Sequence, residues 1–132
     1  MITITIGQEN EVWLTVAEKT TITNPNYLFV FKSDMTKKEV IFIAPYVNNA
    51  EYSVFTIEEA SSNLNFLQGK IKLTPSGFWS YEVYQQTSSS NLVPTSAQGL
   101  VEVGKVQVLD TPYTDSIYQQ QSTTNEVYIN GK

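Results

Sequence analysis

The side chains that could do chemistry in this chain are its carboxylates and its aromatic rings. Among 132 residues there are 13 Asp and Glu, 8 Tyr, 6 Phe and 2 Trp, but no Cys, no His and no Arg, so all eight basic residues are Lys. Without Cys and His, a structural zinc site, a Cys or Ser–His nucleophile and a histidine base are excluded. We therefore expect a protein that is not an enzyme and that binds no metal or cofactor.

The carboxylates have no spacing that is typical of a metal or catalytic site. Asp34, Asp110 and Asp115 are isolated, and no calcium-loop motif is present in the sequence. Glu58 and Glu59 are adjacent, so on a strand their side chains would point to opposite faces. A two-carboxylate hydrolase would need both acids about 5–9.5 Å apart in one cleft, which no motif here indicates. We expect these acids to be solvated surface charges.

Several aromatic residues raise the possibility of a platform on which sugar rings stack. Packing in the core or between sheets is the commoner fate of such side chains. Trp13 is the best candidate for exposure, because Val12, Leu14 and Val16 occupy the inward face of its strand. The aromatic residues considered for a platform are Trp13, Tyr46, Tyr52, Phe78 and Tyr84.

Charge and hydropathy argue against nucleic acid and membrane as partners. The net charge is −5, and a chain without Arg lacks the bidentate phosphate and guanine contacts that nucleic-acid recognition favours. No apolar run approaches the roughly 20 residues that a membrane span needs. Residues 1–6 alternate Ile with Thr and have no basic region, so we do not expect a secretory signal peptide.

The stretch 77–86 has the clearest strand pattern in the chain. Trp79, Tyr81 and Val83 lie on one face of the alternation, and polar or aromatic residues lie on the other. These are large side chains, and each aromatic ring can bury roughly 150–250 Å². The pattern predicts a central strand of an antiparallel sandwich with this face in the core.

Further segments predict the strands around it. Residues 27–31 and 40–44 are apolar on both faces, which is typical of buried strands, and a polar loop between them predicts a hairpin. Residues 52–57 predict another strand. Residues 2–6 and 12–16 are either two parts of one strand that crosses between sheets or two short edge strands.

A hairpin is predicted immediately before the central strand. Residues 70–74 are expected to pair with residues 77–86 across Pro75–Gly77, where Pro can take the first turn position and Gly a positive φ.

Residues 100–109 predict the last core strand, with a change of phase inside it. Val101 and Val103 are out of phase with Val106 and Val108. One extra residue at Gly104 would bring all four valines to one side, as a β-bulge does. The alternative is a strand that is covered on both faces.

Together these segments predict an all-β protein: an antiparallel, immunoglobulin-like β-sandwich of seven or eight strands over residues 1–110. The spacing Gly77-x-Trp79-x-Tyr81 is similar to the G-x-Y-x-C of immunoglobulin strand F, with Trp79 at the corner position.

Residues 111–132 are predicted to form an extended C-terminal arm. The stretch before residue 126 is too polar to form a core of its own. Tyr113 and Tyr118 are suitable anchors on a partner, and the β-prone run Val127, Tyr128 and Ile129 can add to an exposed strand edge. We expect truncation after residue 110 to leave the sandwich folded and to weaken its attachment to partner chains.

Several segments together resemble small β-sandwich virion proteins of tailed bacteriophages, of the auxiliary capsid or head-decoration kind. They cover most of residues 12–109, and each is mainly a strand-and-turn pattern. Where such proteins often have an acidic residue after the central strand's Val-Tyr, this chain has Gln85. The matching segments are residues 14–16, 23–31, 77–86, 90–92 and 99–108.

The resemblance implies a non-enzymatic structural protein of the virion, made in the host cytoplasm, with no catalytic residue to carry over. Its expected partners are other virion proteins, either the capsid or neighbouring copies. The alternative is a carbohydrate- or receptor-binding module of a phage tail, a fibre or a cell surface, which would bind glycans through exposed aromatic rings such as Trp13 and through the loop 87–98.

Overall fold

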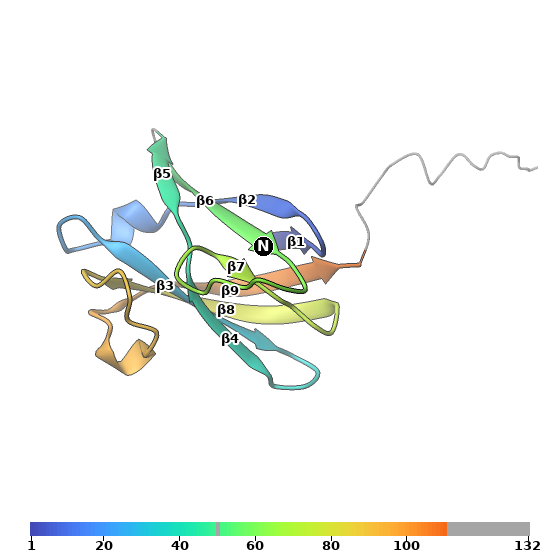
Figure 1. Ribbon diagram of the computed structural model, residues 1–132. Helices are drawn as coiled ribbons and strands as arrows, with labels where there is room; N and C mark the ends of the chain where they lie inside the picture. The colour runs from blue at the N-terminus through green and yellow to red at the C-terminus, as the bar shows by residue number, and fades with distance from the viewer. Residues whose placement is uncertain (50, 111–132) are drawn as a thin grey trace, which may run out of the picture.

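The computed structural model describes residues 1–49 and 51–110 as two β-sheets packed face to face (Figure 1). One sheet has the order β1-β9-β8-β3-β4, and the other has the order β2-β6-β5 with β7 added to β6. Two short 3-10 turns, η1 and η2, lie in the connections. The bounds are β1 (Ile2–Thr5), β2 (Glu9–Leu14), η1 (Val16–Lys19), β3 (Asn26–Ser33), β4 (Glu39–Ile43), β5 (Tyr46–Asn49), β6 (Tyr52–Glu59), β7 (Lys70–Ile71), β8 (Gly77–Gln86), η2 (Pro94–Ser96) and β9 (Leu100–Leu109).

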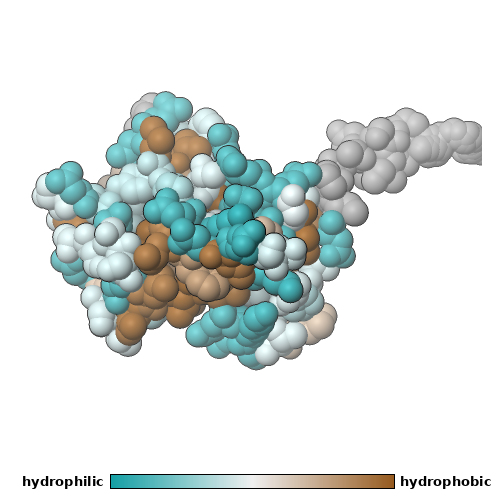
Figure 2. Space-filling view, in the orientation of Figure 1, coloured by the Kyte–Doolittle hydropathy of each residue, from teal (hydrophilic) through white to brown (hydrophobic). Residues whose placement is uncertain are grey.

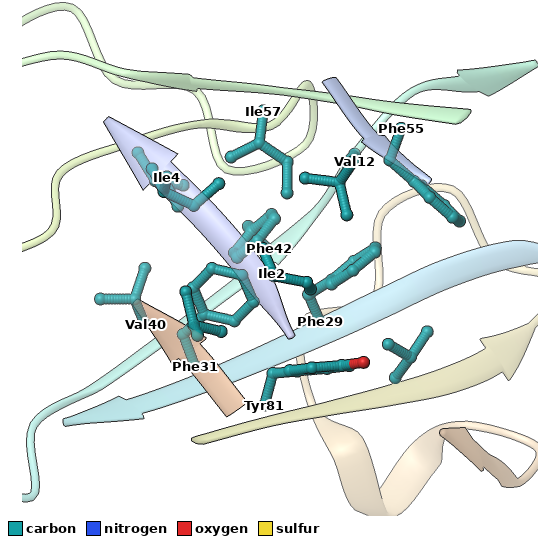
Figure 3. Packing of buried hydrophobic residues seen from close by; sticks show 14 of the residues in the cluster. Ile2, Ile4, Val12, Phe29, Phe31, Val40, Phe42, Phe55, Ile57 and Tyr81 are labelled. Carbon is teal, nitrogen blue, oxygen red and sulfur yellow. The ribbon is translucent and has the colours of Figure 1, made fainter. Parts of the chain in front are cut away.

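The core lies between the sheets and is rich in aromatic rings (Figure 3). Phe29 of β3 stacks on Phe42 of β4 with ring centroids 5.1 Å apart, and it meets Phe55 of the opposite sheet edge to face at 5.0 Å. Outer-face residues of β3 are buried as well, since Leu28 and Val30 are shielded from solvent. The predicted buried strands at 27–31 and 40–44, and the hairpin between them, are confirmed.

β8 is the central strand that the sequence predicted. It lies between β9 and β3, and Trp79, Tyr81 and Val83 are all buried in the core. The indole Nε1 of Trp79 donates to the carbonyl of Pro75 at 3.0 Å. A side chain at this position that bonds back to the backbone a few residues upstream is the arrangement of the immunoglobulin corner residue.

The strand order confirms the immunoglobulin-like sandwich, with differences in number and direction. There are nine strands in the described part of the chain rather than seven or eight, and β1 runs parallel to β9 at the edge of the larger sheet. β1 and β2 are short edge strands of different sheets, which settles the alternative that the sequence left open.

The predicted hairpin between residues 70–74 and β8 is wrong. β7 pairs in parallel with the end of β6 in the smaller sheet, whereas β8 belongs to the larger sheet. Ile71 and Leu73 are fully buried between the layers, so this segment crosses from one sheet to the other. Local alternation indicates a strand but does not specify its partner.

The predicted bulge in β9 exists but is at another residue. Glu102 pairs with Val83 and Leu100 with Tyr84, so Val101 is the extra residue. Val103 therefore lies on the outer face and does not join the other valines. Gly104 serves a different purpose, because a methyl group there would lie 2.6 Å from the ring of Tyr81.

Candidate interaction surfaces

An apolar patch around Trp13 lies on the outer face of the smaller sheet. Trp13 is opposite Val54 in the pairing of β2 with β6, and Val54 is opposite Val47 of β5. The ring of Tyr52 meets Trp13 edge to face, with centroids 5.7 Å apart. Trp13 is 52% exposed and Val47 is 70% exposed, which confirms the predicted exposure of Trp13. We call these four residues the Trp13 patch.

The structure separates the other aromatic residues that were considered for a sugar platform. Tyr46 packs on the core, and its hydroxyl donates to a backbone carbonyl in the loop before β3 at 2.6 Å. Phe78 is exposed on the opposite sheet, and the hydroxyl of Tyr84 donates to a neighbouring carboxylate there. Only Tyr52 joins Trp13, with 61° between the ring planes. The two rings therefore do not form one flat platform.

The remaining predicted partner-binding residues lie in the C-terminal arm. Tyr113, Tyr118, Val127, Tyr128 and Ile129 fall outside the described residues. Their docking role stays a prediction.

A second apolar surface, which sequence reasoning missed, lies along the edge strand β4. It is a groove of about 390 Å³ between β4 and the loop that follows β6. Figure 2 shows apolar side chains gathered over this part of the molecule. The signal in the sequence was the apolar run Leu64-Asn65-Phe66-Leu67 inside an otherwise polar loop. We call this surface the β4 groove; its lining residues are Lys38, Glu39, Val40, Ile41, Leu64, Phe66 and Lys72.

The backbone of β4 is open beside this groove. β4 is the last strand of its sheet, and the amide of Ile43 donates to the carbonyl of Phe66 at 2.7 Å, on the side away from β3. Backbone groups alternate in direction along a strand, so the N–H and C=O groups of Ile41 and Glu39 also point away from β3. The loop covers the end of the edge at Ile43 and leaves the part from Glu39 to Ile41 accessible for pairing.

Glu59 corrects the expectation that the singled-out acids are solvated. Its side chain is only 4% exposed, and its two oxygens accept hydrogen bonds from the amides of Gly7 at 2.8 Å and Leu73 at 3.0 Å. Glu58 points to the other face, as predicted for adjacent residues on a strand. The carboxylate of Glu59 thus joins the β1–β2 turn to the segment that crosses between the sheets.

Two of the three Asp residues that the sequence singled out make a side-chain contact at the surface. Asp34 forms an ion pair with Lys105, and Asp110 accepts a hydrogen bond from the hydroxyl of Ser76 at 3.0 Å. Asp115 lies outside the described residues. Across residues 1–49 and 51–110, no group of three or more Asp or Glu could hold a metal ion.

A polar cavity of about 470 Å³ lies at the seam where β1 and β2 diverge. The hydroxyl of Tyr81 donates to Oε2 of Glu102 at 2.6 Å in its wall. Burial, together with the hydrogen bond to Glu102, raises the pKa of Tyr81 above its ordinary value of 10.0. The hydrogen bond joins β8 to β9 at the edge of the core.

The raised pKa of Tyr81 predicts a loss of stability at alkaline pH. The folded state favours the neutral phenol, so this contribution is present below pH 10 and is lost as the pH rises toward the folded-state pKa. We expect the urea midpoint to fall less between about pH 8 and about pH 11 in Tyr81→Phe than in the unaltered chain. The pKa values of Tyr46 and Tyr84 are also raised, and both residues are present in both chains. An equal fall of the urea midpoint in both chains would therefore contradict the contribution of Tyr81.

The loop 87–98, which the alternative function would use for binding, is attached to β8 by buried amides. The side chain of Gln86 donates to the carbonyl of Asn91 at 3.0 Å, and the amide of Asn91 donates back to Gln86 at 2.8 Å. Gln85 accepts from the backbone amide of Thr21 at 2.8 Å. That bond attaches the segment before β3, whereas the side-chain NH₂ of Gln85 donates to the carbonyl of Gln98 at 3.4 Å. The bonds of Gln86 and Gln85 to Asn91 and Gln98 hold the loop 87–98 against the sandwich.

The fold and these surfaces define an all-β, immunoglobulin-like sandwich with two exposed apolar contact surfaces. Comparison of the chain with protein-family models, with curated proteins and with solved structures finds no match in any of the three. In the part of the chain that is described, no helix is long and apolar enough to cross a membrane.

Proposed function

We propose that this chain is a non-enzymatic structural protein of a bacteriophage virion, of the auxiliary or decoration kind. It docks on the capsid or on neighbouring copies through the edges of its sandwich and its C-terminal arm. In this proposal it is made in the host cytoplasm and functions in the virion.

The observation that carries the proposal is the open edge of β4 beside an apolar groove. A single-chain protein normally protects such an edge with charges, bulges or a covering loop, because it pairs readily with another chain. Here the loop covers only Ile43 and charged side chains flank the open part at Lys38 and Glu39, but the groove beside it has an apolar wall of Leu64 and Phe66. A surface of this kind suits a protein whose task is to bind other proteins.

Mass spectrometry of purified phage particles tests the proposal. We expect the chain to be present in many copies per particle and to be released as an intact domain. Particles that lack the chain, purified from cells that make it, would refute the virion assignment.

A glycan-binding module is the second candidate, and the exposure of Trp13 beside Tyr52 favours it. One exposed ring offers an apolar face on which a sugar can stack. A glycan that raises the melting temperature of the unaltered chain but not of Trp13→Ala would support this candidate. The proposed structural role predicts no such shift.

A further inference from the structure

We propose that the run Val127–Ile129 of one copy adds as a strand to the edge of β4 in a neighbouring copy, with its side chains in the β4 groove. The inference rests on the proposed function, in which many copies stand close together on one particle. It specifies the edge, the docking segment and the partner.

The open edge and the docking segment have the same length. Beyond Ile41, the loop carbonyl of Phe66 already occupies the amide of Ile43, so only Glu39–Ile41 can accept a new strand. Val127–Ile129 is a β-prone run of three residues after a polar stretch. A longer strand would collide with the loop, whereas three residues fill the available backbone groups.

The chemistry of the groove matches the run. On a strand, Val127 and Ile129 share one face and Tyr128 takes the other. One face can therefore cover the apolar wall of Leu64 and Phe66, while Tyr128 keeps its hydroxyl in water. The exposed cations Lys38 and Lys72 line the same groove. Their charge is opposite to that of Glu126, the residue that precedes the run in the sequence.

The length of the arm lets it reach a neighbouring copy as well as its own edge, and the close spacing of copies in the proposed function is what favours the neighbouring copy. The end of β9 and the start of β4 are at the same end of the larger sheet, because Val108 pairs with Gly77, Trp79 with Ser33, and Lys32 with Glu39. Three strand spacings separate them, about 14 Å. The 16 residues from 111 to 126 can span about 50 Å. A domain of this size is about 30 Å across, so the arm is far longer than closure on its own edge needs and can reach a second domain.

Cysteine cross-linking of full-length chains tests the proposal, since the chain has no Cys of its own. One batch of the chain carries Glu39→Cys, and a second batch carries Tyr128→Cys and a size tag. The two batches are mixed with a short bifunctional thiol reagent. We expect dimers of mixed size. The matched control is Thr3→Cys on β1, the opposite edge of the same sheet; equal yields from Thr3→Cys and Glu39→Cys would overturn the proposal.

A chain that carries both Glu39→Cys and Tyr128→Cys distinguishes the two possible donors of the strand. Cross-linked monomers without dimers would mean that the arm closes on its own edge, and the proposed partner would be wrong. Cross-linked dimers that disappear when an excess of unaltered chain is added support exchange between copies.

Two variants test whether strand pairing is the cause of the cross-linking. Ile41→Pro removes an amide that faces away from β3, so the existing ladder is retained and the yield of mixed dimers should fall about tenfold. Ile129→Asp changes only the arm, so it leaves the sandwich sequence intact, and it should lower the yield similarly. Unchanged yield in Ile129→Asp would refute the docking of this run.

The outcomes separate this inference from the proposed function. Many copies in particles without any cross-link between Glu39→Cys and Tyr128→Cys would refute the arm docking and leave the virion role in place. Cross-linking in solution, with no chain in particles, would refute the virion role and leave the arm docking in place.

Discussion

Replacing Trp79 with alanine is expected to lower the free energy of unfolding by about 3–5 kcal/mol. The indole is fully buried between the sheets, packs opposite Val106, and donates a hydrogen bond to the carbonyl of Pro75. The substitution removes the apolar contacts and leaves that carbonyl without its partner. Since a domain of this kind has about 5–15 kcal/mol in total, the variant should be marginally folded. Urea titration followed by circular dichroism measures the loss.

The second tryptophan of the chain provides the matched control. Trp13 is half exposed on the outer face of the smaller sheet, so Trp13→Ala should cost about 1 kcal/mol or less. A loss below about 1 kcal/mol in Trp79→Ala would contradict the assignment of the inward face of β8.

Replacing Glu59 with leucine is expected to lower the free energy of unfolding by about 2–5 kcal/mol. The two oxygens of this carboxylate accept the amides of Gly7 and Leu73; the bond to Leu73 is buried and the bond to Gly7 is partly buried. Leucine fills a similar volume but accepts no hydrogen bond, so the amide of Leu73 stays unpaired in the interior and the amide of Gly7 loses its charged partner. Urea unfolding of the purified variant measures the effect.

The neighbouring residue serves as the control for this second change. Glu58 points to the outer face, so Glu58→Leu should change the free energy of unfolding by about 0.5 kcal/mol or less. The loss of unfolding free energy in Glu59→Gln should lie between those of Glu58→Leu and Glu59→Leu. The side-chain oxygen of Gln can accept one backbone amide, while its NH₂ group opposes the other. Similar values for Glu58→Leu and Glu59→Leu would refute the role of the buried carboxylate.

Much of the fold followed from patterns that a strand carries within itself. The inward face of β8, the buried strands β3 and β4 with their hairpin, and the bounds of β9 were all predicted correctly. Alternate side chains must face the core whatever the partner strand is, so residue type reports the face directly. The same reasoning identified Trp13 as exposed, because its neighbours already occupied the inward side.

Errors arose where a residue's fate depends on segments far away in the sequence. Glu59 looked like surface charge because its two amide partners, at Gly7 and Leu73, come from other elements. Gly104 looked like the bulge residue because glycine in a strand often marks one, but its lack of a side chain makes room for the ring of Tyr81. The β4 groove was missed because its two walls come from β4 and from the loop after β6.

Composition and side-chain alternation were enough to indicate the all-β class, most of the strands other than β5, the central position of β8, and the lack of the His and Cys that most hydrolytic and zinc chemistry uses. The packing of the two sheets set which sheet each strand joins, where β9 bulges, which carboxylate is buried and which edge stays open. The physical reason is the range of the interactions: side-chain alternation is set residue by residue, whereas strand partners and hydrogen-bond satisfaction are set by the packing of two layers.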